Sequence, residues 1–274
     1  MKSKLSITIN QKTLKMVDSL IDNLYIRNRS QAMEHLVEKA LGENKTAVIL
    51  AGGYEKNLKI SKEEYRPTAK IGNSTIIELA LKKLRESGFR NLFIVAKPII
   101  LKDIFQIIGD GSKYRVALNY VEEGLEKGSA DSLRLLKGRI KSPFLVVYSD
   151  IIFNQININN LWSAHLKQKA ISTLMIESSL FDWEKAGVVK IEGNKIIEFI
   201  QRPPPKKIGS YIFFSGIFVT EPEIFEYHGA SLEYDVFPLL AQKGFLNSYL
   251  NSAPYFHFHT KEELKKMEPE IKQL

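Results

Sequence analysis

From residue 46 onward, short apolar segments alternate with stretches of helical periodicity, and this alternation restricts the fold more than any other feature of the 274-residue chain. The predicted strands lie near residues 46–50, 91–96, 115–120 and 143–148, and the predicted helices near 74–87, 98–109, 128–137 and 158–168. Strands separated by helices predict an α/β domain with a Rossmann-like, mixed but mainly parallel sheet.

Beyond about residue 171 the segments become shorter, which is typical of an antiparallel excursion from such a sheet. The predicted strands here lie near residues 171–177, 186–191, 195–200 and 211–219, and helices near 234–243 and 261–267 close the chain. The α/β domain is therefore expected to occupy residues 46–274.

A different pattern precedes this domain. Polar and apolar residues alternate through residues 4–9, which predicts a strand with one apolar face. Two amphipathic helices are expected next, the first capped by Asn10 and the second by Ser30 or Asn28. A lone strand with two short helices cannot pair its edges or bury its apolar face. Residues 1–43 therefore predict a separate domain that pairs with a second copy of itself, giving a homodimer or a higher even oligomer.

The order of strand, helix, turn and helix in residues 4–41 resembles the ribbon-helix-helix DNA-binding family. In that family two chains pair their strands into a ribbon that lies in the major groove. The resemblance implies double-stranded DNA as a partner, read by the strand and held by phosphate contacts at the second helix. The residues it assigns to DNA are Lys4, Ser6, Thr8, Arg29 and Ser30. The alternative is that this domain only dimerises and that its polar face is solvated.

Composition excludes several classes of protein. The chain has no cysteine, so disulfides, thiolate metal sites and a cysteine nucleophile are ruled out. No apolar run is long enough to span a membrane, and the N-terminus does not have the pattern of a signal peptide. We therefore expect a cytoplasmic protein without a membrane partner. The net charge of +8 permits phosphate-bearing partners but does not require them.

The most informative motif is the segment 47–53, a buried strand that ends in Gly52 and Gly53. It is neither a P-loop nor the glycine fingerprint of dinucleotide-binding folds. Glycines at this place allow backbone N–H groups to approach a phosphate or a ribose without interference from a Cβ atom. A second apolar strand, near 143–148, leads into Asp150, at the end of the sheet where open α/β folds bind ligands.

Further motifs follow in order along the chain: Arg66-Pro67, Gly128-Ser129-Ala130-Asp131, Ala186-Gly187, Gln201-Arg202 and Ser215-Gly216. Together with the double glycine they resemble the sugar-1-phosphate nucleotidyltransferase family, which joins a nucleoside triphosphate to a sugar phosphate and releases pyrophosphate. The resemblance implies a GT-A-like fold, a nucleotide or nucleotide-sugar ligand and Mg²⁺ as the metal of an active enzyme. It implies catalytic roles for Asp150, Arg66 and Arg202, ligand contacts for Gly52, Gly53, Glu123, Gly128, Ser129, Asp131, Gly187 and Gly216, and metal binding by Asp150 and His257.

Several positions depart from that family's pattern. Glu55 and Asn57 stand where the family has a glycine and the arginine that holds the triphosphate. Glu123 replaces a glutamine that contacts the base, and His257 replaces the second metal-binding aspartate. His257 and His259 alternate with aromatic residues, so a purely structural pair of histidines is the alternative for them. Because phosphoryl chemistry depends on cations positioned around the triphosphate, these departures predict weak or absent catalysis.

Two functions are thus open at this point. The departures favour a dimeric DNA-binding regulator whose nucleotidyltransferase-like domain binds a nucleotide or nucleotide-sugar with little or no turnover. The alternative is an active sugar-1-phosphate nucleotidyltransferase that dimerises through its ribbon-helix-helix domain.

Overall fold

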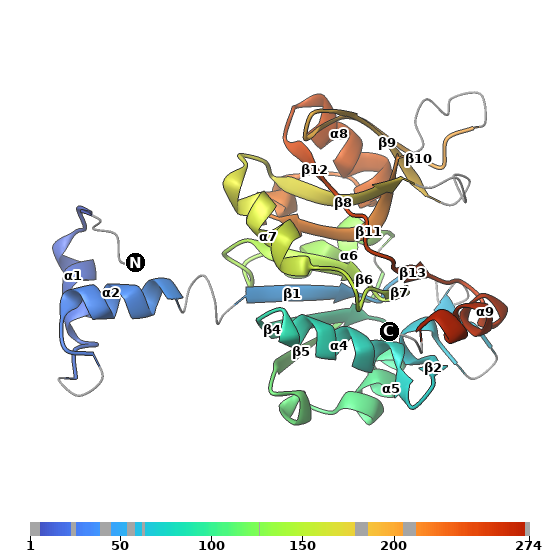
Figure 1. Ribbon diagram of the computed structural model, residues 1–274, viewed down its shortest axis with the longest axis horizontal. Helices are drawn as coiled ribbons and strands as arrows, with labels where there is room; N and C mark the ends of the chain where they lie inside the picture. The colour runs from blue at the N-terminus through green and yellow to red at the C-terminus, as the bar shows by residue number, and fades with distance from the viewer. Residues whose placement is uncertain are drawn as a thin grey trace. The chain divides into compact units, whose positions relative to one another are not determined.

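The computed structural model of the protein contains two compact units, residues 1–45 and residues 46–274, called unit 1 and unit 2 (Figure 1). The structure describes residues 6–22, 26–38, 45–53, 58–61, 64–125, 127–178, 186–204 and 212–271. Lys4, Glu55 and Asn57 lie outside these ranges. No helix within the described ranges is long and apolar enough to cross a membrane.

Unit 2 is built on a nine-stranded sheet. Its strand order is β5 (Ala117–Glu122), β4 (Phe89–Ala96), β1 (Lys45–Leu50), β6 (Phe144–Tyr148), β11 (Ile212–Thr220), β8 (Ser172–Ser178), β12 (Leu246–Leu250), β10 (Lys195–Gln201) and β9 (Gly187–Glu192). The strand β1 is parallel to β6, and β4 is parallel to β5. In contrast, β11 is antiparallel to β6 and β8, and β10 is antiparallel to β12 and β9. The predicted α/β architecture is confirmed, and the sheet is mixed, with its antiparallel pairs in the second half.

Helices cover both faces of this sheet, which is why its central strands β1, β6 and β11 are nearly continuous buried runs. Along β1, Ala47 and Ile49 face one hydrophobic core, whereas Val48 and Leu50 face the other. The first core is closed by α4 (Ile76–Glu86), α5 (Pro98–Ile108) and α7 (Ile158–Lys167). The second core is closed by α6 (Ser129–Arg134) and α8 (Phe237–Gln242) (Figure 1).

A third, smaller core lies at the end of the sheet where β6 finishes. The short strand β7 (Ile151–Ile152) pairs antiparallel with β13 (Phe256–His257). The helix α9 (Lys261–Ile271) contributes Leu264 to the same core, in which Phe258 is fully buried. Figure 1 shows β7, β13 and α9 together at one end of β1. The C-terminal segment is therefore held beside the residue that follows β6.

Short elements complete unit 2. They are the 3₁₀ turns η2 (Arg66–Thr68), η3 (Ser112–Tyr114) and η5 (Pro222–Glu226), the π-helix η6 (Leu232–Val236), and the paired strands β2 (Lys70–Ile71) and β3 (Ser74–Thr75). Thr75 and Glu78 form a reciprocal capping box that fixes the start of α4.

Unit 1 contains α1 (Gln11–Asp18) and α2 (Arg29–Glu38). Asn10 caps α1, since its Oδ1 accepts the backbone N–H of Thr13 at 2.8 Å. Asn28 caps α2 in the same manner by accepting the N–H of Gln31 at 2.9 Å, so of the two predicted caps Asn28 is the one used.

Residues 6–9, the described part of the strand predicted for residues 4–9, form no ladder within a single chain. A strand needs a partner to satisfy its backbone groups, and the described residues of a single chain supply none here.

Candidate active site

The carboxyl ends of the parallel strands bring several of the predicted residues to one edge of the sheet. Gly52 and Gly53 follow β1, Glu123 follows β5, and Asp150 follows β6. This edge is the part of an open α/β sheet where ligands bind. The strand order thus explains why residues from distant parts of the sequence meet.

Glu123 is 2% exposed and packs directly against the double glycine. Its Oε2 accepts the backbone N–H of Gly53 at 2.9 Å, and the hydroxyl of Ser132 donates to its Oε1. Gly53 has a φ of +115°, which favours glycine, and a Cβ atom at Gly52 would lie 2.3 Å from Oε2, so a side chain there would have to displace this carboxylate. The N–H group that was predicted to approach a phosphate is bonded to a carboxylate of the chain itself.

Asp150 forms the centre of a charged cluster. Its Oδ2 accepts a hydrogen bond from Arg66 Nη1 at 2.8 Å and lies 3.1 Å from His257 Nε2. The side chains of Asp150 and Arg66 are each 14% exposed, whereas that of His257 is 42% exposed. Potential ligand atoms of Asp150, His257 and His259 all lie within 4.8 Å of one another. The cluster therefore opens to solvent on the side of the histidines.

Opposite charges decide the protonation states in this cluster. Burial disfavours the carboxylate of Asp150, but the charge of His257, its hydrogen bond and the charge of Arg66 outweigh it, so the pKa of Asp150 is lowered. Burial also disfavours the imidazolium of His257, yet the carboxylate of Asp150 raises the pKa of this histidine. For His259, burial and the nearby His257 lower the pKa. The Nε of Arg66 is buried without a hydrogen-bond partner among the described residues.

The turn before α6 is fixed by contacts within the chain. A Cβ atom at Gly128 would lie 2.6 Å from the carbonyl oxygen of Ala230. That carbonyl accepts the backbone N–H groups of Ala130 and Asp131, at 2.9 and 3.1 Å. The carboxylate of Asp131 pairs with Arg134 three residues later. These groups hold the turn in place, and the N–H groups of the second and third residues of α6 are already hydrogen-bonded within the chain.

Glu233, on η6, is a residue of this region that sequence analysis did not find. Its carboxylate accepts hydrogen bonds from Ser129 at 2.6 Å, from Ser231 at 2.8 Å and from the hydroxyl of Tyr148. Burial, followed by the charge of Glu233, raises the pKa of Tyr148. The network links the end of β6 to the start of α6. The one sequence signal that could have pointed to this glutamate is its place in the acidic and aromatic segment 233–237.

The remaining predicted residues lie farther along the antiparallel strands. At Gly187 in β9 a Cβ atom would lie 2.4 Å from the ring of Phe199, and at Gly216 in β11 it would lie 2.5 Å from Ile151. Arg202 follows β10, is exposed and has a φ of 50°. No described hydrogen bond or ion pair joins Arg202 to the cluster around Asp150.

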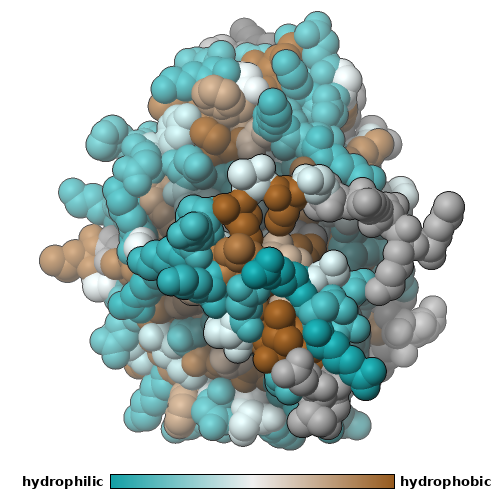
Figure 2. All heavy atoms as spheres, turned by 90° about the vertical axis from the view of Figure 1, so that its left-hand side faces the viewer, coloured by the Kyte–Doolittle hydropathy of each residue, from teal (hydrophilic) through white to brown (hydrophobic). Residues whose placement is uncertain are grey.

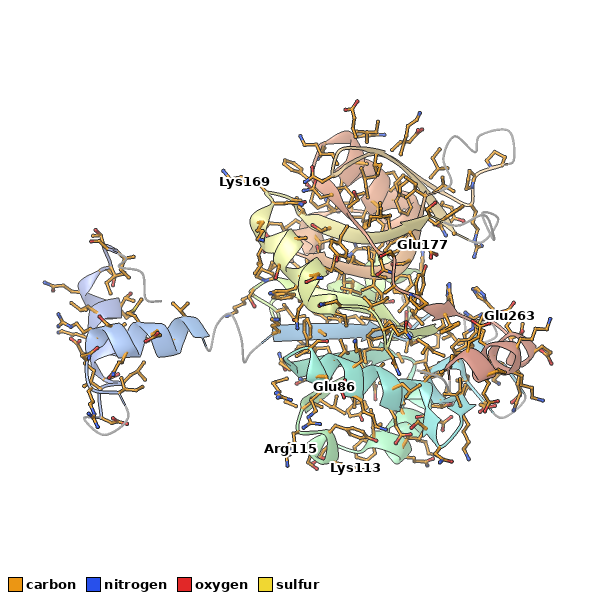
Figure 3. The ribbon with its side chains drawn as sticks, in the orientation of Figure 1. Glu86, Lys113, Arg115, Lys169, Glu177 and Glu263 are labelled. Carbon is orange, nitrogen blue, oxygen red and sulfur yellow. The ribbon has the colours of Figure 1, made fainter. Side chains whose placement is uncertain are left out.

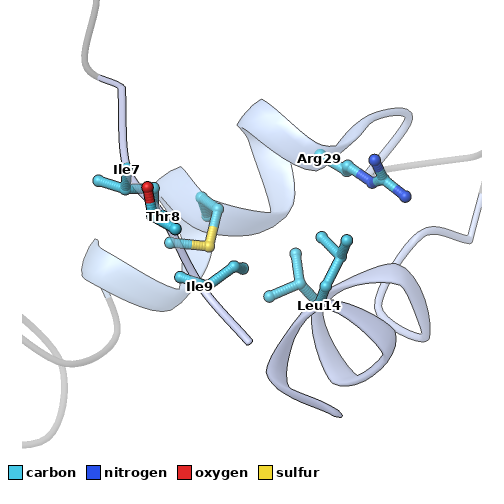
Figure 4. Close-up of a pocket in the computed structure, with 7 residues that line it drawn as sticks. Ile7, Thr8, Ile9, Leu14 and Arg29 are labelled. Carbon is cyan, nitrogen blue, oxygen red and sulfur yellow. The ribbon is translucent and has the colours of Figure 1, made fainter. Parts of the chain in front are cut away.

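In unit 1, the predicted DNA-binding side chains that the structure describes are exposed, but one of them is already paired. Arg29 donates to both carboxylate oxygens of Asp18, at 2.7 and 2.9 Å. Ser6, Thr8 and Ser30 are exposed. A groove of about 360 Å³ runs beside them and is lined by Ile7, Thr8, Ile9, Leu14, Val17, Arg29 and Met33 (Figure 4).

The fold and this edge of the sheet define a class: α/β domains with a mixed sheet that gather charged side chains at the carboxyl ends of their parallel strands. Residues 46–253 match the family of nucleotidyl transferases, and the chain belongs to that family. The resemblance seen in the sequence is confirmed for these residues. The match begins at residue 46, and the comparisons do not support the ribbon-helix-helix prediction for the residues before it.

Two curated relatives illustrate the sequence similarity. The chain is 25% identical over 217 residues to UTP–glucose-1-phosphate uridylyltransferase of Synechocystis, covering 72% of this chain and 55% of the relative. It is 28% identical over 195 residues to the bifunctional IPC transferase and DIPP synthase of Aquifex aeolicus, covering 66% of this chain and 40% of the relative. The chain thus spans about half the length of the curated relatives it matches.

Solved structures show the same fold. A putative glucose-1-phosphate thymidylyltransferase from Bacillus anthracis, in complex with a sucrose, superposes with a TM-score of 0.73 at 22% identity, covering 84% of this chain and 96% of that one. The inositol-1-phosphate CTP transferase from T. maritima superposes with a TM-score of 0.69 at 18% identity, covering 85% and 98%. At these identities the similarity establishes the fold of unit 2.

Proposed function

We propose that the protein is an active sugar-1-phosphate nucleotidyltransferase, which converts a nucleoside triphosphate and a sugar 1-phosphate into a nucleotide sugar and pyrophosphate. The observation that carries the proposal is the position of Asp150, which follows β6 at the ligand edge of the sheet and contacts Arg66 and His257. Membership of the nucleotidyl transferase family supports the same reaction class. The comparisons favour this activity over a DNA-binding regulator without turnover.

The reaction moves one nucleotidyl group. An oxygen of the sugar phosphate forms a bond to the α-phosphorus, and the bond from that phosphorus to the bridging oxygen of the β-phosphate breaks. Pyrophosphate leaves with the electron pair. The protein therefore needs positive charge beside the phosphates and groups that align the attacking oxygen.

Arg66 is the residue best placed to supply that charge. Its guanidinium is held by Asp150 through Nη1, while its Nε is buried and has no partner among the described residues. A phosphate oxygen satisfies such a donor with a charge-assisted hydrogen bond. Asp150 in turn fixes the orientation of the guanidinium, so that it does not have to be ordered when the substrate binds.

The metal implied by the resemblance is Mg²⁺, and the donors around Asp150 do not suit it. Mg²⁺ prefers an octahedral shell of oxygen ligands and keeps several waters. The groups present are one carboxylate and two imidazoles. In the proposed mechanism Arg66 therefore neutralises the negative charge of the phosphates, and no step depends on Mg²⁺.

We also propose that unit 1 joins two chains. The side chain of Ile7 is 49% exposed at the mouth of the apolar groove, and Met16 and Val37 are 64% and 46% exposed. Figure 2 shows hydrophobic side chains lying among hydrophilic ones on one face of the molecule. A second copy of the segment around Ile7 would cover this apolar surface and supply the missing strand partner. Double-stranded DNA receives weaker support, because Arg29 is occupied by Asp18.

A screen tests the activity. Each of the common nucleoside triphosphates is incubated with a panel of sugar 1-phosphates and with several divalent metal ions, and pyrophosphate release is measured. We expect release only when both substrates are present. If calorimetry shows nucleotide binding but no pair of substrates releases pyrophosphate, the proposal is wrong and the regulator becomes the better account.

A further inference from the structure

The cluster around Asp150 contains more metal-binding groups than the resemblance predicts. Asp150 and His257 were expected, and His259, two residues after His257 and just beyond the end of β13, lies in the same group. Phe258 between the two histidines is fully buried, so alternation along the segment points both imidazoles away from that core. The two imidazole rings lie with their centroids 4.5 Å apart.

The distances approach those of a metal site. Ligand atoms about 2.1 Å from one ion lie roughly 3.0 to 3.4 Å from each other in octahedral or tetrahedral geometry. Asp150 Oδ2 and His257 Nε2 already lie 3.1 Å apart, and the whole group of three is within 4.8 Å. The side chains of His257 and His259 are 42% and 30% exposed, so an ion can reach the site from solvent.

A second carboxylate lies beside the third ligand. Glu263, on α9, lies with its Oε2 3.7 Å from Nδ1 of His259 and accepts the backbone N–H of the same residue at 2.6 Å (Figure 3). This leaves Nε2 of His259 as the nitrogen for an ion. Histidine ligands of metals commonly have a carboxylate at the other ring nitrogen, which fixes the tautomer and increases the basicity of the ligand.

The kind of donor decides the kind of ion. Imidazole nitrogen suits Zn²⁺, Co²⁺, Ni²⁺ and Fe²⁺, and two histidines with one carboxylate form a common site for such ions. Mg²⁺ rarely accepts imidazole in place of oxygen. Arg66 shares Asp150 Oδ2 with His257, so an incoming ion competes with the guanidinium for this oxygen or uses the other one.

We infer that Asp150, His257 and His259 form a binding site for a divalent first-row transition metal ion, with Zn²⁺ and Co²⁺ preferred over Mg²⁺. The inference deepens the proposed function, since it names the metal that this site would offer to a phosphate-bearing substrate. Glu263 is a positioning residue, because it acts on the ion only through His259.

Direct binding tests the site without turnover. The metal-free full-length protein is titrated with Co²⁺, and the visible absorption of the bound ion is followed. Zn²⁺ and Mg²⁺ are then added as competitors. We expect one Co²⁺ per chain, displaced by Zn²⁺ at stoichiometric amounts and by Mg²⁺ only in large excess. Mg²⁺ that competes as well as Zn²⁺ would overturn the inference.

Variants locate the ion. His257→Ala and His259→Ala should each weaken Co²⁺ and Zn²⁺ binding by at least about 10-fold, and Glu263→Gln by roughly 10-fold, the scale seen when an outer carboxylate is lost. The matched control is His228→Ala, at an exposed histidine outside the cluster, which should bind as the wild type does. Circular dichroism confirms that each variant is folded. Wild-type affinity in both His257→Ala and His259→Ala places the ion elsewhere and rejects the site.

The metal site and the proposed function can fail separately. Binding of Zn²⁺ at these residues with no pyrophosphate release from any substrate pair would reject the transferase and keep the site. Pyrophosphate release supported by Mg²⁺, with no Zn²⁺ binding at the histidines, would reject the site and keep the transferase.

Discussion

Gly52 and Glu123 lie in close contact: a Cβ atom at Gly52 would lie 2.3 Å from Glu123 Oε2, so a side chain there would have to displace the buried carboxylate. The same oxygen accepts the N–H of Gly53 at 2.9 Å. Gly52 has no positive φ, so close approach rather than backbone conformation explains the glycine at this position. One buried carboxylate therefore fixes the loop that leaves β1.

Gly52→Ala should destabilise unit 2 by about 1–3 kcal/mol, because the added methyl group overpacks the site. Glu123→Ala removes the obstructing carboxylate, so adding Gly52→Ala in that background should cost less than about 0.5 kcal/mol. Denaturant unfolding followed by tryptophan fluorescence measures this cycle, since both tryptophans lie after residue 45 in the sequence. Equal costs in the two backgrounds would show that the two residues are not in contact.

His165 gives the protein a defined pH dependence. The residue is 1% exposed, its Nδ1 lies 2.9 Å from Thr173 Oγ1, and its Nε2 lies 3.3 Å from Glu221 Oε1. Burial lowers the pKa of His165 to about 4, below the value of about 6.5 expected in the unfolded chain. Between these values the unfolded state binds the proton more readily. The free energy of unfolding should thus be fully retained above about pH 6.5 and fall as the pH decreases toward 4.

The slope of this loss should be at most about 1.4 kcal/mol per pH unit, the value for uptake of one proton. Urea unfolding at a series of pH values measures it. His165→Gln cannot take up a proton and serves as the matched comparison, because the loss between pH 6.5 and 4.5 should be smaller in this variant. A variant with the same pH dependence as the wild type would assign the effect to other groups.

Ile7→Asp should convert the protein to a monomer, because a charge would enter the apolar surface that unit 1 is proposed to bury between two chains. Lys12→Glu is the control at an exposed position of α1. Sedimentation velocity distinguishes the species. A wild-type protein that is monomeric at micromolar concentration would refute the proposed dimer.

Arg66→Ala should weaken binding of the nucleoside triphosphate, because the variant loses the charge and the free Nε donor. Arg66→Lys keeps the charge but not the fork of donors, so its affinity should be intermediate. Calorimetry with the triphosphate compares the three proteins. If all three bind it equally, Arg66 does not contact phosphate.

The elements of unit 2 were predictable because their signals are local. The strand expected at residues 46–50 is Lys45–Leu50, and the helix expected at 98–109 is Pro98–Ile108. Continuous apolar runs mark strands covered on both faces, and a 3.6-residue repeat marks the helices between them. The change from parallel to antiparallel pairing after residue 171 was also expected, and β11 pairs antiparallel with both of its neighbours β6 and β8.

The parts that were not predictable depend on contacts between distant residues. The pairing of β13 with β7 places His259 beside Asp150, and no local pattern indicates this pairing. The hydrogen bond from Ser129 to Glu233 likewise joins residues that lie far apart in the sequence, so no local pattern indicates it. The strand expected at residues 4–9 stays a prediction, because its pairing requires a partner that a single chain does not provide.

The measurement that tests the central claim most directly is the formation of a nucleotide sugar, followed by ³¹P NMR, from a nucleoside triphosphate and a sugar 1-phosphate. The account predicts that the wild type forms nucleotide sugar and pyrophosphate in equal amounts. Asp150→Asn should lower the rate of nucleotide-sugar formation at least roughly 100-fold, because the variant lacks the charge that orients Arg66. The matched control Asp110→Asn, at an exposed carboxylate, should keep it. A wild type that binds both substrates without forming product, or an Asp150→Asn variant as fast as the wild type, would contradict the account.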